Sequence, residues 1–207
     1  MGQTSHDNEN KSKYNIIDIE NEAKILKSIN SDFVVKYYES FIEQNYFNIV
    51  MEYCENSDLG NFIKAHKSMN KLIDERVIFY ISLDICSGIQ EIHSKNLIHR
   101  DLKPDNLFIS KDFKIKIGDF GISKQLTNTF NYAKTTIGTF TYIAPEILKG
   151  EKYNKKVDIW ALGCILYELF SLNKCFDCSN IAGLINQITY MEHGKIDTHI
   201  YNIEWQI

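Results

Sequence analysis

The stretch HRDLKPDN, residues 99–106, decides how this sequence is interpreted. It places two carboxylates, a lysine, an arginine and an asparagine close together, with Pro104 stiffening the loop between them. Two short apolar segments follow, NLFIS and KIKIG, on either side of the turn KDF. This pattern predicts two short strands that pair with each other. We expect the pairing to return the chain to the loop and to bring Asp119 close to Asn106.

The side chains of this loop are those that phosphoryl transfer requires. The amide oxygen of Asn106 and the carboxylate of Asp119 are hard oxygen ligands, which suit Mg²⁺. The carboxylate of Asp101 is then free to orient a hydroxyl and accept its proton, and Lys103 can neutralise charge on a transferring phosphoryl group. Any one of these residues alone has a simpler explanation, such as a loop cap or a solvated lysine. The ordered string favours the catalytic interpretation.

Three further motifs follow this loop: DFG at residues 119–121, GTFTYIAPE at 138–146 and DIWALGCILYEL at 158–169. Together with the loop, they make the chain resemble a eukaryotic protein kinase. In that family they are the metal-binding turn, the end of the activation segment and the helix that anchors the catalytic lobe. Lys103, two residues after Asp101, is typical of the Ser/Thr branch. The segments VMEYCENSDL and AKTTIGT are most similar to the NIMA-related kinases.

The resemblance implies an α+β fold of the two-lobe protein-kinase type, with an incomplete N-terminal β lobe and a mainly helical C-terminal lobe. Residues 1–13 are polar, and we expect them to form a disordered tail. Residues 14–54 are expected to form part of the N-terminal lobe. They comprise a helix, because apolar residues recur every three or four positions from Ile16 to Ile29, and then a strand hairpin. Residues 55–207 are expected to form the C-terminal lobe, without its usual last helices.

The resemblance also implies roles for individual residues of the catalytic loop and its surroundings. Asp101 would be the catalytic base or the residue that orients the hydroxyl, and Lys103 would contact the γ-phosphate of ATP. Asn106 and Asp119 would hold Mg²⁺. Thr139 is expected to bridge Asp101 and Lys103.

A second group of residues is implied to bind the nucleotide. Met51 is the expected gatekeeper, and Glu52 and Cys54 would offer hinge backbone groups to the adenine. Asp58 would bond the ribose, and Phe108 would form the floor under the base. Each also has a structural interpretation, because Met51 and Phe108 suit an apolar core and Asp58 suits a helix N-cap.

Further residues are implied in regulation and support. Thr135 stands where an activating phosphate is often found, added by another kinase or by autophosphorylation, although Thr136 is an equally good acceptor chemically. Arg100 supplies a cation that could bind such a phosphate. Asp158 should accept hydrogen bonds from the HRD backbone, because a buried carboxylate needs partners. The expected partner is a protein substrate with a Ser or Thr acceptor.

The nucleotide-binding half of the pattern is incomplete. Glu22 matches the helix glutamate that pairs with a strand lysine, but residues 2–7, where that lysine is expected, contain none. No G-x-G-x-x-G occurs anywhere in the chain. Two alternatives therefore stay open. One is a Ser/Thr kinase whose sequence here is a fragment or a shortened gene model, weak or inactive as an isolated chain. The other is a pseudokinase that serves as a binding scaffold.

Composition argues against several other classes. The 207 residues carry a formal net charge of −4, which does not favour a nucleic-acid partner. No apolar run approaches the length of about 18 residues that spans a membrane. The polar N-terminus does not resemble a secretory signal, so a cytoplasmic location and reduced thiols are expected. Cys175 and Cys178 have the spacing of a redox or zinc motif, but no second such pair completes four ligands.

Overall fold

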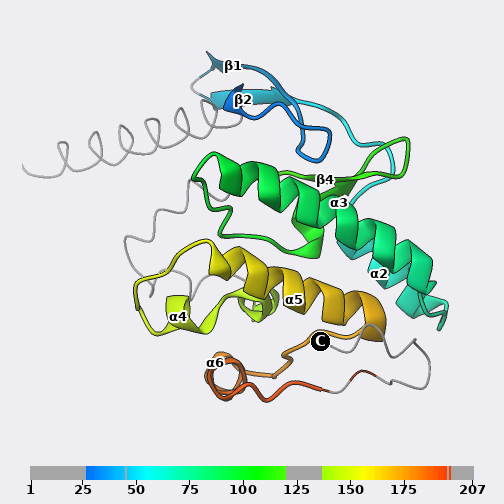
Figure 1. The fold of residues 1–207 in the computed structure, drawn as a ribbon, viewed down its shortest axis with the longest axis vertical. Helices are drawn as coiled ribbons and strands as arrows, with labels where there is room; N and C mark the ends of the chain where they lie inside the picture. Colours follow the sequence, from blue (N-terminus) through cyan, green and yellow to red (C-terminus); the bar gives the residue numbers. More distant parts are fainter. Residues whose placement is uncertain (1–26, 45, 120–136, 195, 197–207) are drawn as a thin grey trace, which may run out of the picture.

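The computed structural model describes residues 27–44, 46–119, 137–194 and 196, which form a small β-hairpin and a larger, mainly helical unit (Figure 1). The described elements, in chain order, are β1 (Tyr37–Glu43), β2 (Tyr46–Met51), α2 (Leu59–Ser68), α3 (Glu75–Ser94), η1 (Pro104–Asn106), β3 (Leu107–Ile109), β4 (Ile115–Ile117), η4 (Ile137–Tyr142), α4 (Pro145–Leu148), α5 (Lys156–Ser171) and α6 (Ile181–Tyr190). Helices and short hairpins therefore occur together, which is the α+β class that the sequence predicts.

Strands β1 and β2 form an antiparallel hairpin, as the Val- and Tyr-rich sequence with its polar turn predicts. Beside the turn, Glu43 pairs with Tyr46. At the open end, the backbone N–H of Glu52 donates a 2.8 Å hydrogen bond to the carbonyl of Lys36. The segment that leaves the hairpin is therefore still bonded to the start of β1.

The β3–β4 hairpin is joined to the chain that leads into β1. The carbonyl of Phe33 accepts a 2.9 Å hydrogen bond from Ile117, and the carbonyl of Ile117 accepts one of 2.9 Å from Val35. Gly88 of α3 approaches the same strand closely, because a Cβ built at this position would lie 2.7 Å from Cδ1 of Ile117. A larger side chain at residue 88 would therefore push α3 away from β4.

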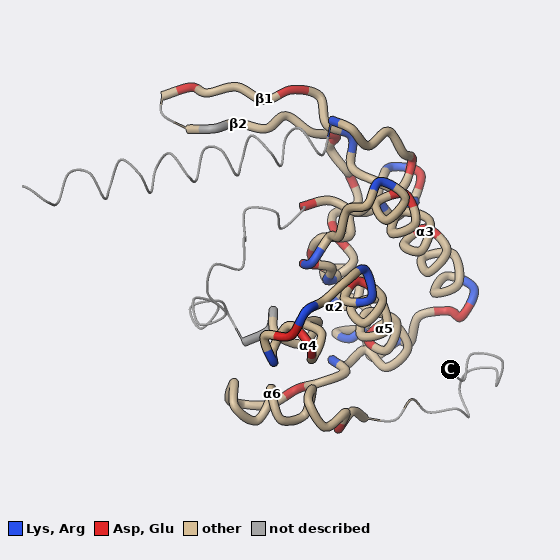
Figure 2. Tube along the Cα trace, turned by 60° about the vertical axis from the view of Figure 1, so that its left-hand side comes forward, with Lys and Arg blue, Asp and Glu red and all other residues tan. Residues whose placement is uncertain are grey.

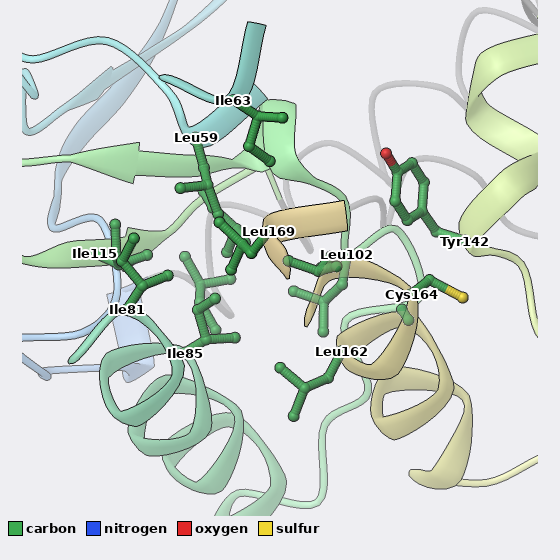
Figure 3. Packing of buried hydrophobic residues seen from close by; sticks show 14 of the residues in the cluster. Leu59, Ile63, Ile81, Ile85, Leu102, Ile115, Tyr142, Leu162, Cys164 and Leu169 are labelled. Carbon is green, nitrogen blue, oxygen red and sulfur yellow. The ribbon is translucent and has the colours of Figure 1, made fainter. Parts of the chain in front are cut away.

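Helices α3 and α5 pack against each other and enclose the hydrophobic core (Figures 1 and 3). Asp74 stands before apolar residues that recur at the helical period, which predicts a helix with this residue as its N-cap. In the structure, Asp74 caps α3 by accepting a 2.9 Å hydrogen bond from the N–H of Arg76. The nearly all-apolar run VDIWALGCILYELF predicts a buried helix, and half of the residues of α5 are buried. Side chains from α2, α3, β4 and α5 meet in one cluster that includes Leu59, Ile63, Ile81, Ile85, Ile115, Leu162 and Leu169. Burial of each fully buried aliphatic side chain, such as Leu59 or Ile85, contributes about 1.5–3 kcal/mol to stability.

One expectation about the helical unit is wrong. The sequence predicts a loop from Gly118 to Gly150, but the second half of that stretch contains η4 and α4. Pro145 begins α4, at a position where a missing N–H has no cost. The helix expected over residues 16–29 lies outside the described residues except at its end, where residues 27–28 are helical.

Charged residues are distributed over all parts of the described fold. Acidic and basic residues are interspersed along the trace, in keeping with the small net charge of −4 (Figure 2). Within the described ranges, no helix combines the length and the apolar character needed to cross a bilayer.

Candidate active site

The loop at residues 99–106 is anchored to the buried helix α5 by one carboxylate. Asp158 is 2% exposed and accepts 2.9 Å hydrogen bonds from the backbone N–H groups of His99 and Arg100. Nε2 of His93 donates a third bond to this carboxylate at 2.7 Å. Three donors therefore compensate the buried charge. The prediction that Asp158 bonds the HRD backbone is confirmed.

The side chain of His99, which is completely buried, links this loop to the residue after β4. Its Nδ1 accepts a 3.3 Å bond from the N–H of Asp101, so the ring proton lies on Nε2, which donates to the carbonyl of Gly118 at 3.1 Å. Burial lowers the pKa of His99, although nearby carboxylates, Asp158 foremost, oppose this shift. A neutral His99 therefore fixes the spacing between Asp101 and Gly118.

The side chains of Lys103 and Asn106 both contact Asp101 within the loop. Nζ of Lys103 lies 3.1 Å from Oδ2 of Asp101, and the two side chains are only 16% and 11% exposed. Nδ2 of Asn106 donates to the carbonyl of Asp101 at 2.8 Å and lies 3.3 Å from its Oδ2. Because the amide nitrogen of Asn106 is engaged by Asp101, its amide oxygen is the atom suited to bind a metal.

Asp119 directly follows Gly118, whose backbone is hydrogen-bonded to Asn106. The N–H of Gly118 donates to the carbonyl of Asn106 at 3.0 Å. A Cβ at Gly118 would lie 2.8 Å from Cε2 of Phe108 and 2.9 Å from Cγ2 of Val35, so a glycine permits this approach. Asp119 itself is exposed, with φ of +52°. The hairpin thus places the accessible carboxylate of Asp119 next to Gly118, which bonds Asn106. The carboxylate of Asp119 and the amide oxygen of Asn106 form a donor set that fits Mg²⁺.

The predicted hinge residues lie between the β1–β2 hairpin and the helical unit. Met51 ends β2 and is 40% exposed. The carboxylate of Glu52 lies 2.9 Å from Nζ of Lys116 in β4 and accepts a 3.1 Å bond from the N–H of Lys36. Cys54 is half-buried, and burial raises the pKa of its thiol. Because the side chain and the N–H of Glu52 are both engaged, its carbonyl is the group that could contact an adenine.

Asp58 and Phe108 lie side by side at the start of α2, where they form an isolated antiparallel bridge. The carboxylate of Asp58 accepts bonds from the backbone and side-chain N–H groups of Asn61, at 2.8 and 2.7 Å. The N-cap interpretation of Asp58 is therefore confirmed. Phe108 is only partly buried, between the buried Leu107 and Ile109, because successive strand residues face opposite sides.

Three predicted site residues are not described in full. Glu22 and Thr135 lie outside the described residues. Thr139 belongs to η4, but its side chain lies outside the described part of the chain. Their roles stay predictions.

Two residues of this arrangement were not indicated by the sequence. His93 contacts Asp158 across 65 residues of chain, and Lys116 contacts Glu52 across 64. Neither a motif nor a periodicity predicts such long-range contacts. Lys116 lies between two buried strand residues, and a largely buried lysine needs a charged or polar partner. This position could have indicated that Lys116 forms an ion pair.

Comparison with known proteins agrees with this geometry. A family model described as "Protein kinase domain" matches residues 3–205. "Serine/threonine-protein kinase Nek1" of Mus musculus is 41% identical over 178 residues, which are 86% of this chain and 15% of that protein. "Serine/threonine-protein kinase Nek8" of Danio rerio is 41% identical over 170 residues, 82% of this chain and 24% of that protein. "Probable serine/threonine-protein kinase nek2" of Dictyostelium discoideum is 39% identical over 181 residues, 85% of this chain and 43% of that protein.

The chain spans less than half the length of these three relatives. The family match nevertheless extends over nearly all of its own residues. The described residues also assemble the loop, the anchoring helix and the strand that leads into Asp119. The chain therefore belongs to the protein kinase family and is similar to the Nek serine/threonine kinases.

Proposed function

We propose that the protein is a serine/threonine kinase, which transfers the γ-phosphoryl group of ATP to a hydroxyl of a protein substrate. The observation that supports this most strongly is that Lys103 and Asn106 both contact Asp101, with distances of 2.8–3.3 Å between the polar atoms. Phosphoryl transfer requires positioning and charge stabilisation more than covalent catalysis. A carboxylate, a cation and an amide already held in contact supply both.

In the proposed mechanism, Asp101 orients the substrate hydroxyl and accepts its proton. Lys103, 3.1 Å from Asp101, is placed to neutralise charge on the phosphoryl group. Asn106 and Asp119 are the residues that would hold Mg²⁺, which when bound neutralises charge on the phosphate oxygens. Because His99 and Asp158 hold the loop in place, less entropy is lost when the substrate binds.

For the nucleotide, we propose that the carbonyl of Glu52 and the N–H of Cys54 contact the adenine beside Met51. Phe108 would lie beneath the base. The carboxylate of Asp58 would bond the ribose. Asp58 caps α2 and forms a β-bridge with Phe108. Glu22 would belong to the same site through the helix that the sequence predicts over residues 16–29.

We also propose a class of substrate and a site of regulation. The relatives are named serine/threonine kinases, which supports a protein substrate with a Ser or Thr acceptor. Phosphorylation of Thr135, by another kinase or by the protein itself, would give Arg100 an anionic partner. In the structure, the guanidinium of Arg100 lies 5.6 Å from the ring centroid of Tyr153, so a phosphate would compete with a weak cation–π contact.

The activity of this polypeptide is proposed to be weak. It contains no G-x-G-x-x-G, and no lysine stands where a partner of Glu22 is expected. Loss of one preorganised contact to a reacting group typically costs about 3 kcal/mol, or about 10²-fold in rate. The same features support the alternative function, a kinase-like binding module without catalysis.

A kinase assay distinguishes a serine/threonine kinase from a binding module without catalysis. It measures transfer of the labelled γ-phosphate of ATP to a generic protein substrate with Ser and Thr residues. Asp101→Asn is expected to lower the rate at least about 100-fold, because it removes the proton acceptor. The matched control is Asp105→Asn, in the same loop, whose exposed carboxylate pairs only loosely with Lys64 at 3.7 Å. We expect the control to keep its activity. Equal rates for the wild-type protein and Asp101→Asn would contradict the proposed function and favour the binding module.

A further inference from the structure

An apolar groove of about 450 Å³ lies between helices α3 and α5, which run side by side in the helical unit (Figure 1). Cys86 and Ile89 of α3 and Ile159 and Leu162 of α5 form the apolar part of its lining. Ile89 and Leu162 are buried and make the floor, whereas Cys86 and Ile159 are exposed at the rim. We propose that this groove is the docking site of residues 197–207 of the same chain.

The exposed apolar surface continues from the groove along α3. Phe79, Leu83 and Cys86 follow one another at intervals of four and three residues, so they lie on one face of the helix. Phe79 is 41% exposed and Leu83 47%, and Ile159 across the groove is 45% exposed. A surface helix normally turns polar residues toward water, and a contiguous apolar surface marks an interaction site. This face therefore fits a segment that carries an apolar stripe of its own.

Residues 197–207 supply such a stripe. Their sequence is DTHIYNIEWQI, in which Ile200, Ile203 and Ile207 recur at intervals of three and four. This spacing predicts an amphipathic helix with the three isoleucines on one side and Asn202 on the other. The isoleucine side is the one that would enter the groove.

The chain that leads into this segment is already held against α5. The ring of His193 lies edge-on to that of Tyr167 in α5, with centroids 6.4 Å apart, and Ile196 packs against the hydrophobic core cluster. Tyr167 and Ile159 are eight residues apart on α5, which is about 12 Å along the helix axis and about two turns. Eleven residues span about 16 Å as a helix and at most about 36 Å when extended, so residues 197–207 can reach the groove.

The tether favours this segment over a separate molecule. A short linker holds an attached segment at an effective concentration in the millimolar range. A second copy of the chain or another protein would have to compete with residues 197–207 at that concentration. The proposal concerns packing and does not depend on catalysis, so it can fail or succeed independently of the proposed kinase function.

The thiol of Cys86 at the rim of the groove reports whether the groove is covered. Its alkylation rate is measured by mass spectrometry in the full chain, with Cys54 at the hinge as the internal standard. Ile203→Asp should raise the rate at Cys86 about tenfold or more, because a carboxylate is costly to bury in an apolar groove. The matched control Asn202→Asp adds the same charge on the opposite side and should leave the rate unchanged. Equal rates at Cys86 in the wild-type protein and both variants would overturn the proposal.

A cross-link tests the same contact with a milder substitution, in case Ile203→Asp impairs folding and exposes the buried Cys164 as well. Ile203→Cys is treated with a short bismaleimide and digested with trypsin. Residues 77–95, which contain Cys86, should be joined to residues 196–207 within one chain, and Asn202→Cys should give much less of this product. A link between two chains would assign the groove to a second copy. That result, a link from residue 203 to another cysteine, or equal yields in the two variants would overturn the proposal.

Discussion

The backbone N–H of Arg100 donates a 2.9 Å hydrogen bond to the buried carboxylate of Asp158, 58 residues further along the chain. Arg100 adopts a left-handed conformation with φ of +71°, which costs a residue with a Cβ about 1–2 kcal/mol. The surrounding structure must offset this strain. The hydrogen bonds to Asp158 do so, and they fix the direction in which the chain enters Asp101.

Asp158→Ala is predicted to lower the free energy of unfolding by about 3 kcal/mol, because it leaves the N–H groups of His99 and Arg100 buried without an acceptor. Asp158→Asn should also destabilise the protein, since an amide nitrogen replaces one carboxylate oxygen and cannot accept the backbone bond that this oxygen accepts. Urea denaturation measures both losses. A loss below about 1 kcal/mol for the alanine variant would show that the loop does not depend on this anchor.

Acidification is predicted to destabilise the protein in part through His99. Burial holds the pKa of His99 below its ordinary value of about 6.5, so the unfolded chain binds a proton at this residue before the folded protein does. The stability contributed by the neutral ring is therefore complete above about pH 6.5 and is lost as the pH falls toward the lower folded pKa.

Thermal unfolding of the wild-type protein and of His99→Gln between pH 8 and pH 5 measures this contribution. The difference in stability between them should shrink as the pH falls, because glutamine supplies an acceptor and a donor but does not titrate. Glu168, whose pKa is raised by burial, acts in the opposite direction but is common to both proteins. A difference that stays constant with pH would contradict a neutral, buried His99.

Two glycine-to-alanine substitutions are predicted to act in opposite directions. Gly118→Ala should cost about 1–3 kcal/mol, because the new methyl group would meet Phe108 at 2.8 Å and Val35 at 2.9 Å. Gly163→Ala in α5 meets no atom within 4 Å and should stabilise the helix by about 0.5–1 kcal/mol. Denaturant titration compares them. A neutral Gly118→Ala would show that the approach of Asp119 to the loop does not need a glycine.

The Glu52–Lys116 ion pair is predicted to stabilise the hinge measurably. The two side chains are 24% and 13% exposed, their charged atoms are 2.9 Å apart, and Glu52 also bonds the backbone of Lys36. A double-mutant cycle with Glu52→Gln and Lys116→Met should give a coupling energy of about 1 kcal/mol or more. The exposed Lys114–Asp32 pair, at 3.9 Å, is the control and should couple by less than about 0.5 kcal/mol. Equal coupling in the two pairs would refute the special role of the hinge pair.

The local elements were predictable because their signals are local. The helical spacing of apolar residues in α3, the cap at Asp74 and the short strands around residues 111–113 each follow from a few neighbouring residues. The contacts of His93 and Lys116 were not predictable, since their partners are far away in the sequence.

The central claim is that Asn106 and Asp119 bind one divalent ion next to Asp101. Mn²⁺ with ATP at millimolar concentration, observed through paramagnetic broadening of backbone amide resonances, tests it without requiring turnover. We predict the strongest broadening at Asn106 and Asp119 and a weaker effect at Asp101. Asp119→Asn should reduce the broadening at Asn106, while Asp112→Asn, in the exposed β3–β4 turn, should not. Broadening centred on another part of the protein, or unchanged in Asp119→Asn, would contradict the account.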